Sequence, residues 1–135
     1  MGKHESSYLL DRIESLCSAL YVSGAGYKLL LVIQKQCQAL ITSSKTTFFW
    51  DTCAGHAILL SLGGGIVPYD LFIELSHQPG LPEEWTSEQL LQIQIRYERK
   101  ESVNKYNNPH GLIAYSSIEM FNKLYGALMV YLLSR

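Results

Sequence analysis

The spacing of apolar residues predicts a chain in which helices and strands alternate. Apolar side chains recur at helical spacing over residues 6–20 and again in the segment that ends at Ile33. Strands are expected at four short apolar runs bounded by glycine, proline or polar residues, namely 20–22, 39–42, 66–67 and 111–115. This order of elements predicts a layered α/β domain with a mixed sheet.

The strongest local signals lie between Trp50 and Gly65. Asp51 precedes an apolar run and is typical of a helix N-cap, and Gly63 is a helix stop signal. We therefore expect a helix that starts at Asp51. A carboxylate at the positive end of a helix can hold a hard cation, and the free N–H groups beside it favour an anion. The pattern indicates that metal and phosphate could meet at this helix start.

The residues around Asp51 are expected to pack. Phe48, Phe49 and Trp50 are consecutive aromatics that bury a large apolar area, so we assign them to the core, where they would fix Asp51. Cys53 and His56 are three residues apart on one helix face, a spacing that also suits a nucleophile and its base. No third member or stable positive environment supports such a site, and we expect both to be packing residues.

The second half of the chain gives weaker signals. Residues 70–75 are expected to form a short helix, and the alternation of apolar and polar residues over 87–97 favours a half-exposed strand. Ser116 and Glu119 have capping-box spacing and predict the start of the last helix. Its expected buried stripe contains Ile118, Phe121, Leu124, Tyr125, Leu128 and Leu132. We assign no chemistry to residues 76–110.

Composition limits the partners of the chain. The 135 residues suffice for one domain, and the net charge of −1 without a basic stripe argues against nucleic acid. With 47% hydrophobic and 17% charged residues, the chain is apolar for a domain that stands alone in water. Cys17, Cys37 and Cys53 form no C-x-x-C pair, which favours a reducing, cytoplasmic location. No apolar run is long enough for a membrane span.

Three stretches resemble a known family. Trp50-Asp51, then Cys53-Ala54-Gly55, an Ala-Ile-Leu run and a Gly-Gly pair resemble the second signature of the inositol monophosphatase family, magnesium-dependent and lithium-sensitive phosphatases. The stretches from Gly24 to Lys28 and from Gly111 to Tyr115 are similar to the branch that acts on inositol polyphosphates. The resemblance runs from about residue 19 to residue 116 and covers only the C-terminal half of the family's domain.

The resemblance implies a site. Asp51 aligns with a Mg²⁺ ligand, and Gly24, Ala25, Lys28 and Thr46 align with substrate contacts. The implied reaction is metal-assisted hydrolysis of the 1-phosphate of inositol bisphosphates and trisphosphates, without a covalent enzyme intermediate. Taken alone, the glycines at 24 and 26 would only turn the chain, and most lysines on a surface are simply solvated. The resemblance, together with Lys28 one turn into a helix, favours a phosphate cradle.

Most of the family's metal ligands have no counterpart in this sequence. No Asp-Pro-Ile-Asp-Gly-Thr segment occurs, and one carboxylate cannot build the octahedral oxygen shell of Mg²⁺. We therefore expect residues 1–135 to be a single partial domain whose partner is the missing N-terminal half, and we expect the isolated chain to be inactive. Two alternatives stay open. One is a non-catalytic module that binds phosphoinositols or associates with a phosphatase, and the other is a sugar-bisphosphate or nucleotide phosphatase of the same superfamily.

Overall fold

The computed structural model describes residues 24–42, 47–76, 84–97, 108 and 110–133. Three strands form one sheet, β1 (Ala39–Thr42), β2 (Gly65–Pro68) and β3 (Leu112–Tyr115), in the order β1-β3-β2. Within these described ranges, five helices pack around the sheet, α2 (Ala25–Ile33), α3 (Phe49–Ser61), α4 (Tyr69–Ser76), α5 (Ser87–Gln92) and α6 (Ile118–Leu133). The α/β class is confirmed, but both strand pairings among the described residues are antiparallel, whereas a mixed sheet was expected. The elements expected over 6–20 and 20–22 lie outside the described residues.

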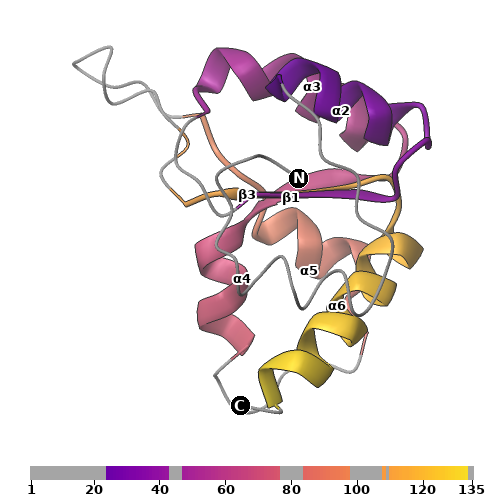
Figure 1. Ribbon diagram of the computed structural model, residues 1–135, viewed down its shortest axis with the longest axis vertical. Helices are drawn as coiled ribbons and strands as arrows, with labels where there is room; N and C mark the ends of the chain where they lie inside the picture. The colour runs from indigo at the N-terminus through magenta and orange to yellow at the C-terminus, as the bar shows by residue number, and fades with distance from the viewer. Residues whose placement is uncertain (1–23, 43–46, 77–83, 98–107, 109, 134–135) are drawn as a thin grey trace.

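Helices cover both faces of the sheet. Figure 1 shows α2 and α3 on one face and α4, α5 and α6 on the other. The central strand β3 is buried throughout, and its residues alternate between the two apolar clusters of the core. Leu40 and Ile66 both pair with Ala114, so the three strands present the same face to α2 and α3. The expectation of a buried strand at 111–115 is confirmed because the sheet is covered on both sides.

The expectation of a strand over 87–97 is wrong. The segment begins as helix α5, whose N-cap Thr86 accepts a hydrogen bond from the Gln89 backbone N–H at 3.3 Å. The Gln89 side chain accepts in return from the Thr86 N–H at 2.9 Å, which completes a capping box. Leu90 is buried while Leu91 is 61% exposed, so the apolar alternation does not mark a strand face. The Thr-x-x-Gln spacing is the local signal that outweighs it.

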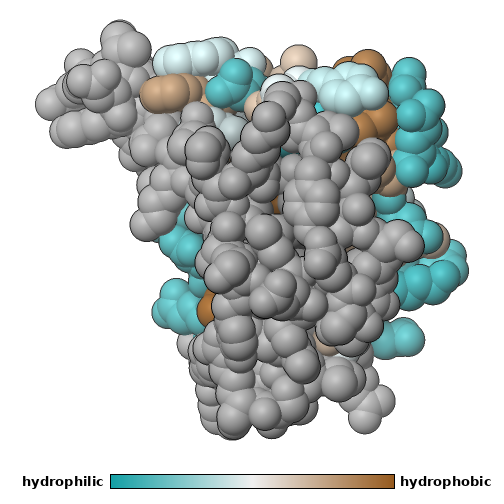
Figure 2. All heavy atoms as spheres, viewed as in Figure 1, coloured by the Kyte–Doolittle hydropathy of each residue, from teal (hydrophilic) through white to brown (hydrophobic). Residues whose placement is uncertain are grey.

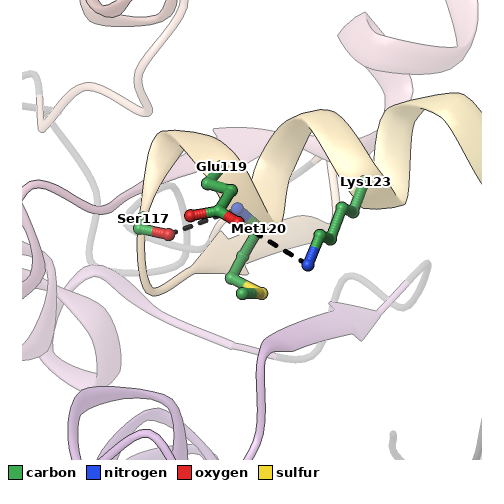
Figure 3. Close-up of polar contacts among 4 residues, drawn as sticks. All are labelled: Ser117, Glu119, Met120 and Lys123. Carbon is green, nitrogen blue, oxygen red and sulfur yellow. Dashed lines mark hydrogen bonds and ion pairs between the residues drawn. The ribbon is translucent and has the colours of Figure 1, made fainter.

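The last helix begins one residue later than the capping signal indicates. The Ser117 Oγ, and not that of Ser116, accepts a hydrogen bond from the Met120 backbone N–H at 3.2 Å, as Figure 3 shows. Glu119 forms an exposed ion pair with Lys123 at 3.6 Å instead of reaching back to the cap. The helix itself is confirmed, and Phe121 and Tyr125 of the expected stripe are buried.

The first two glycines after α3, Gly63 and Gly64, each have a structural reason. Gly63 has a φ of 89°, and its N–H and that of Gly64 bond the carbonyls of Leu60 and Leu59, so the helix ends in a Schellman motif. A Cβ on Gly64 would collide with the backbone carbonyl of Tyr115 on β3. The run therefore ends α3 and lets β2 approach the centre of the sheet.

The α2–α3 layer presents much apolar surface. Figure 2 shows apolar side chains at the surface of this layer, next to polar ones. The most exposed large apolar side chains of the layer are Trp50, Tyr27 and Leu62, at 58%, 53% and 52%. Among the described helices, none combines the length and the apolarity that crossing a bilayer requires.

Candidate functional site

Asp51 lies in the first turn of α3, but it is not the N-cap. Helix α3 begins at Phe49 with Phe48 as N-cap, so Asp51 is the third residue of the helix. Its Oδ2 accepts a hydrogen bond from the Phe48 backbone N–H at 2.8 Å, as the acidic residue of a capping box does. The expected helix start is corrected by two residues, yet the half-buried carboxylate still lies at the positive end of the helix.

Asp51 fits a metal site only as one ligand of several. One of its oxygens is held by Phe48, and the other has no hydrogen-bond partner among the described residues. No group of three or more His, Cys, Asp or Glu side chains in the described ranges is placed to hold a metal ion. Because Mg²⁺ requires near-octahedral oxygen coordination, the Asp51 carboxylate alone does not complete such a site within the described ranges.

The aromatic residues before Asp51 do not form a core. Trp50 is exposed, and its ring stacks on that of Phe48 with centroids 4.5 Å apart. Phe49 is half-buried and meets the ring of Tyr97 edge-on at 5.2 Å. The expectation that all three residues are buried is therefore wrong for Trp50, because it lies on the same exposed face of α3 as Cys53, Ala54 and Ala57. A stacked aromatic pair flanks Asp51 at the surface.

The substrate residues implied by the resemblance lie on the neighbouring helix. Gly24 is the N-cap of α2, with a φ of 89° and no side-chain hydrogen bond to the first turn. Ala25 opens the helix, and Lys28 follows one turn later, half-buried and without an ion-pair partner in the described part of the chain. Thr46 lies outside the described residues. The free N–H groups and the ammonium suit an anion.

Helices α2 and α3 pack closely at Gly55. A Cβ at this position would lie 3.0 Å from the Leu29 Cδ1, so the small residue lets the helices approach. Figure 1 shows that α2 leads into the start of β1 and that α3 begins beyond the end of β1. The N-termini of both helices therefore point toward the same side of the layer. This arrangement places the α2 start and Asp51 on one side of the molecule.

His56 is a buried polar residue with two hydrogen bonds. Its Nε2 lies 2.8 Å from the Gln94 Oε1, and its Nδ1 lies 3.0 Å from the Tyr97 hydroxyl. Burial lowers the pKa of His56 below its usual value, and the bond to Gln94 raises it by less. His56 is thus buried as expected, whereas Cys53 is exposed, which corrects its assignment as a packing residue.

The side-chain amide of Gln94 has one possible orientation. Its Oε1 accepts from the Ile66 N–H at 2.8 Å, and its Nε2 donates to the Leu90 carbonyl at 3.0 Å. Backbone N–H groups only donate and carbonyls only accept, so the two contacts fix the amide. His56 must then donate from Nε2 to the same Oε1. The neutral imidazole consequently carries its proton on Nε2 and offers a lone pair at Nδ1.

The polar contacts continue from Tyr97 to the first turn of α3. The Tyr97 hydroxyl lies 3.3 Å from the Thr52 Oγ1, and Thr52 is fully buried. The side-chain amide of Asn108 donates to the Thr52 Oγ1 at 3.3 Å and to the Phe48 carbonyl at 3.0 Å. Burial raises the pKa of Tyr97 to about 12, so its hydroxyl keeps its proton at neutral pH.

Sequence reasoning missed Gln94, Tyr97 and Asn108. All three lie in the part of the chain to which the sequence assigns no chemistry, and they contact residues 28 to 61 positions away. Local periodicity carries no information about such distant pairs. The glycine run gave an indirect signal, since a Cβ on Gly65 would collide with the Gln94 Oε1. The glycine makes room for that amide.

The lowered pKa of His56 predicts acid sensitivity of the fold. The unfolded chain takes up a proton near pH 6.5, whereas the folded chain resists protonation until a lower pH. The free energy of unfolding should therefore fall as the pH drops below about 6.5. His56→Gln removes this contribution, so its Tm should differ less between pH 7.5 and 5.5 than that of the unaltered chain. An equal or larger Tm difference in the variant would contradict the prediction.

Known proteins resemble this chain over much of its length. The model of the inositol monophosphatase family matches residues 2–105. Inositol polyphosphate 1-phosphatase of Homo sapiens is 41% identical over 97 residues, 70% of this chain and 23% of the human protein. The Mus musculus protein of that name is 42% identical over 102 residues, 74% of this chain and 24% of its own length. The 3'(2'),5'-bisphosphate nucleotidase 1 of Dictyostelium discoideum is 37% identical over 65 residues, 44% of this chain and 21% of that protein. This chain thus spans about a quarter of the length of these relatives. The family match covers well over half of the chain, and the chain belongs to the inositol monophosphatase family.

Proposed function

We propose that this chain supplies part of the site of a Mg²⁺-dependent, lithium-sensitive phosphatase that removes the 1-phosphate of inositol bisphosphates and trisphosphates. The observation that carries the proposal is the carboxylate of Asp51 in the first turn of α3, on the side of the layer toward which α2 also begins. Two relatives that each match at least 70% of this chain are inositol polyphosphate 1-phosphatases, which supports this substrate class.

Each residue has a role that follows from its position. Asp51 would be one oxygen ligand of Mg²⁺, which in such sites activates water and stabilises the leaving oxygen. The Phe48 N–H holds one carboxylate oxygen and leaves the other for the metal. The uncapped N–H groups after Gly24 and the ammonium of Lys28 would bind a phosphate that does not react. Thr46 would contribute a hydroxyl to the substrate.

The proposal extends to the organisation and location of the protein. Residues 1–135 would form a single partial domain, completed by carboxylate ligands that the described residues lack. Cys37 and Cys53 are free thiols, which supports the expectation of a reducing, cytoplasmic environment. The exposed apolar side chains of the α2–α3 layer agree with a surface that is covered in a larger assembly.

A chimera tests this function. The aligned 97 residues of the human relative would be replaced by those of this chain, and phosphate release from inositol 1,4-bisphosphate would be measured. We expect turnover that requires Mg²⁺ and is inhibited by Li⁺ but not by the same concentration of Na⁺. The 135-residue chain alone should release no phosphate. A folded chimera without activity, next to an active human enzyme, would contradict the proposal.

A second function has one observation in its favour. The Dictyostelium relative is by name a bisphosphate nucleotidase, so a nucleotide bisphosphate is the competing substrate class. It matches 44% of this chain, against 70% and 74% for the inositol polyphosphate phosphatases. Phosphate release by the same chimera from adenosine 3',5'-bisphosphate decides between the two substrate classes. Faster hydrolysis of the nucleotide than of inositol 1,4-bisphosphate would favour the second function. A non-catalytic phosphoinositol-binding module is the outcome if the chain binds inositol 1,4-bisphosphate but the chimera does not turn it over.

Lys28→Gln should weaken substrate binding more than it slows the reaction. A lysine on a non-reacting phosphate stabilises the bound substrate and the transition state equally, so its loss raises KM and leaves kcat unchanged. A charged hydrogen bond contributes about 1.5 kcal/mol or more, and the KM of the chimera should rise about tenfold. Lys123→Gln on α6 is the matched control, because its partner is Glu119 on the other face of the sheet. A large fall in kcat with KM unchanged would show that Lys28 acts on the transition state.

A further inference from the structure

A continuous path of hydrogen bonds runs from the middle of α3 back to its first turn. It leaves His56 at Nδ1, passes through the Tyr97 hydroxyl to Thr52, and ends at the carbonyl of Phe48. The Thr52 Oγ1 lies 3.5 Å from the Phe48 carbonyl oxygen and 3.4 Å from that of Phe49, and the Asn108 amide donates to the Phe48 carbonyl at 3.0 Å. We call His56, Tyr97, Thr52, Phe48 and Asn108 the His56 relay.

The relay ends at the residue whose backbone holds Asp51. The Phe48 N–H donates to the Asp51 Oδ2 at 2.8 Å, and the Phe48 carbonyl accepts from the Asp51 N–H at 2.9 Å. A rotation of the backbone at Phe48 that keeps these two bonds would therefore turn the carboxylate. Asn108 and Thr52 restrain that rotation from the buried side of the helix.

The direction of the hydrogen bonds depends on the charge of His56. Tyr97 has one hydroxyl proton for two acceptors, the His56 Nδ1 at 3.0 Å and the Thr52 Oγ1 at 3.3 Å. Because Gln94 fixes the neutral imidazole with its proton on Nε2, Nδ1 accepts a hydrogen bond from the Tyr97 hydroxyl. A protonated imidazole donates from Nδ1 instead, so the Tyr97 hydroxyl turns and donates its hydrogen bond to the Thr52 Oγ1. The hydroxyl of Thr52 then donates to the backbone carbonyls of the first turn.

We propose that His56 is a positioning residue that acts through Tyr97 and Thr52 on the Phe48 backbone and so sets the direction of the Asp51 carboxylate. The importance of that direction for a metal rests on the proposed function. The relay itself is a property of this chain. It joins residues on α3, on the segment after α5 and at position 108, and it gives a role to a histidine that lies outside the proposed metal and substrate contacts.

Few other titratable groups face the relay. Among the described residues these are Tyr97, Tyr115 on the far side of Gln94, Cys53, whose charge acts on Tyr97, and Asp51, whose carboxylate accepts from the Phe48 N–H. Burial raises the pKa of both tyrosines, so they stay protonated through neutral pH. Of His56 and these two tyrosines, His56 is thus the one whose charge changes below about pH 7.

Nuclear magnetic resonance of the ¹⁵N-labelled 135-residue chain tests the proposal. Imidazole spectra at pH 7.5 should show the His56 Nε2 protonated and Nδ1 unprotonated. Backbone spectra from pH 8 to pH 5 should show the Phe48 and Asp51 amide signals moving with the same apparent pKa as the His56 ring. A protonated Nδ1 at pH 7.5, or Phe48 and Asp51 signals that do not follow the His56 titration, would overturn the proposal.

Two variants separate positioning from packing. Tyr97→Phe keeps the ring beside Phe49 and removes the hydroxyl, so His56 should still titrate while the shift of the Phe48 signal is lost. His56→Gln should abolish that shift as well, and Ala57→Ser at the exposed neighbouring position is the control that should retain it. If His56→Gln does not fold, Tyr97→Phe decides. A Phe48 shift that persists in Tyr97→Phe would show that His56 only packs.

The readout distinguishes this inference from the proposed function. The pH-dependent shift of the Phe48 signal requires neither metal nor substrate, so an inactive chimera would leave it standing. Conversely, the chimera could be active while the Phe48 signal of the isolated chain shows no pH-dependent shift. That result would leave the phosphatase proposal intact and remove the role of His56.

Discussion

Asp51→Asn in the chimera with the human relative should reduce phosphate release by a factor on the order of 10² or more. The substitution removes the negative charge that we propose as a Mg²⁺ ligand, and metal stabilisation of the transition state is worth several kcal/mol. The amide oxygen of Asn can still accept the hydrogen bond from the Phe48 N–H, so the capping arrangement survives. Activity at saturating and at low Mg²⁺ is the measurement.

The fold should tolerate this substitution. A charge at the first turn of a helix contributes about 0.3–1 kcal/mol through the helix dipole, which bounds the expected loss of stability. The Tm of the isolated chain in metal-free buffer should therefore fall by a few degrees at most. Measuring both activity and stability separates the role of metal ligand from that of helix cap. If Asp51 only caps the helix, its substitution should change neither quantity by much.

Asp70→Asn is the matched control for Asp51→Asn. Asp70 is also an acidic residue in the first turn of a helix, but α4 covers the other face of the sheet. Its carboxylate lies 3.7 Å from the His110 ring, in an exposed pair worth about 0–1 kcal/mol. The control should keep activity. Near-wild-type turnover of Asp51→Asn at low Mg²⁺ would remove the residue-level support for the phosphatase proposal.

The parts of the fold that could be predicted from sequence are those with local causes. Helices α2, α3 and α4 and the strands β1, β2 and β3 lie where apolar spacing and glycine signals indicate. Errors of one or two residues occur at helix starts, where Ser116 and Ser117 compete for one cap. The strand expected over 87–97 is absent because a capping box at Thr86 and the burial of Leu90 outweigh alternation of apolar residues.

The candidate site was predictable only where a motif is contiguous. Asp51 and Lys28 lie on helices whose positions follow from nearby residues. The contacts of His56 do not, because Gln94 and Tyr97 reach it from 38 and 41 positions away. A histidine on an apolar helix face is interpreted as packing until its hydrogen-bond partners are known. The burial of His56 was therefore predictable, whereas its tautomer and its link to Asp51 required the folded chain.

Gly64→Ala should destabilise the isolated chain more than Asp51→Asn does. The added Cβ would collide with the carbonyl oxygen of Tyr115 and lie 3.0 Å from the carbonyl carbon of Ser116. Tyr115 belongs to the central strand, which is bonded to a strand on each side and cannot move without breaking one pairing. Overpacking of this kind costs roughly 1–3 kcal/mol, and the rigid neighbour favours the upper end.

Gly126→Ala provides a control with the opposite sign. This glycine lies inside α6, and a Cβ there would meet nothing within 4 Å. Alanine removes the entropic cost of glycine in a helix and should stabilise the chain by about 0.5–1 kcal/mol. Urea unfolding of both variants measures the difference, with an unchanged slope against denaturant as evidence that the two-state comparison holds. Because the same methyl group is added in both, a fall in stability at Gly64 together with a rise at Gly126 isolates the close contact between Gly64 and the end of β3. Equal effects at the two positions would show that the close approach at Gly64 relaxes without cost, and that the glycine run is needed only to end α3.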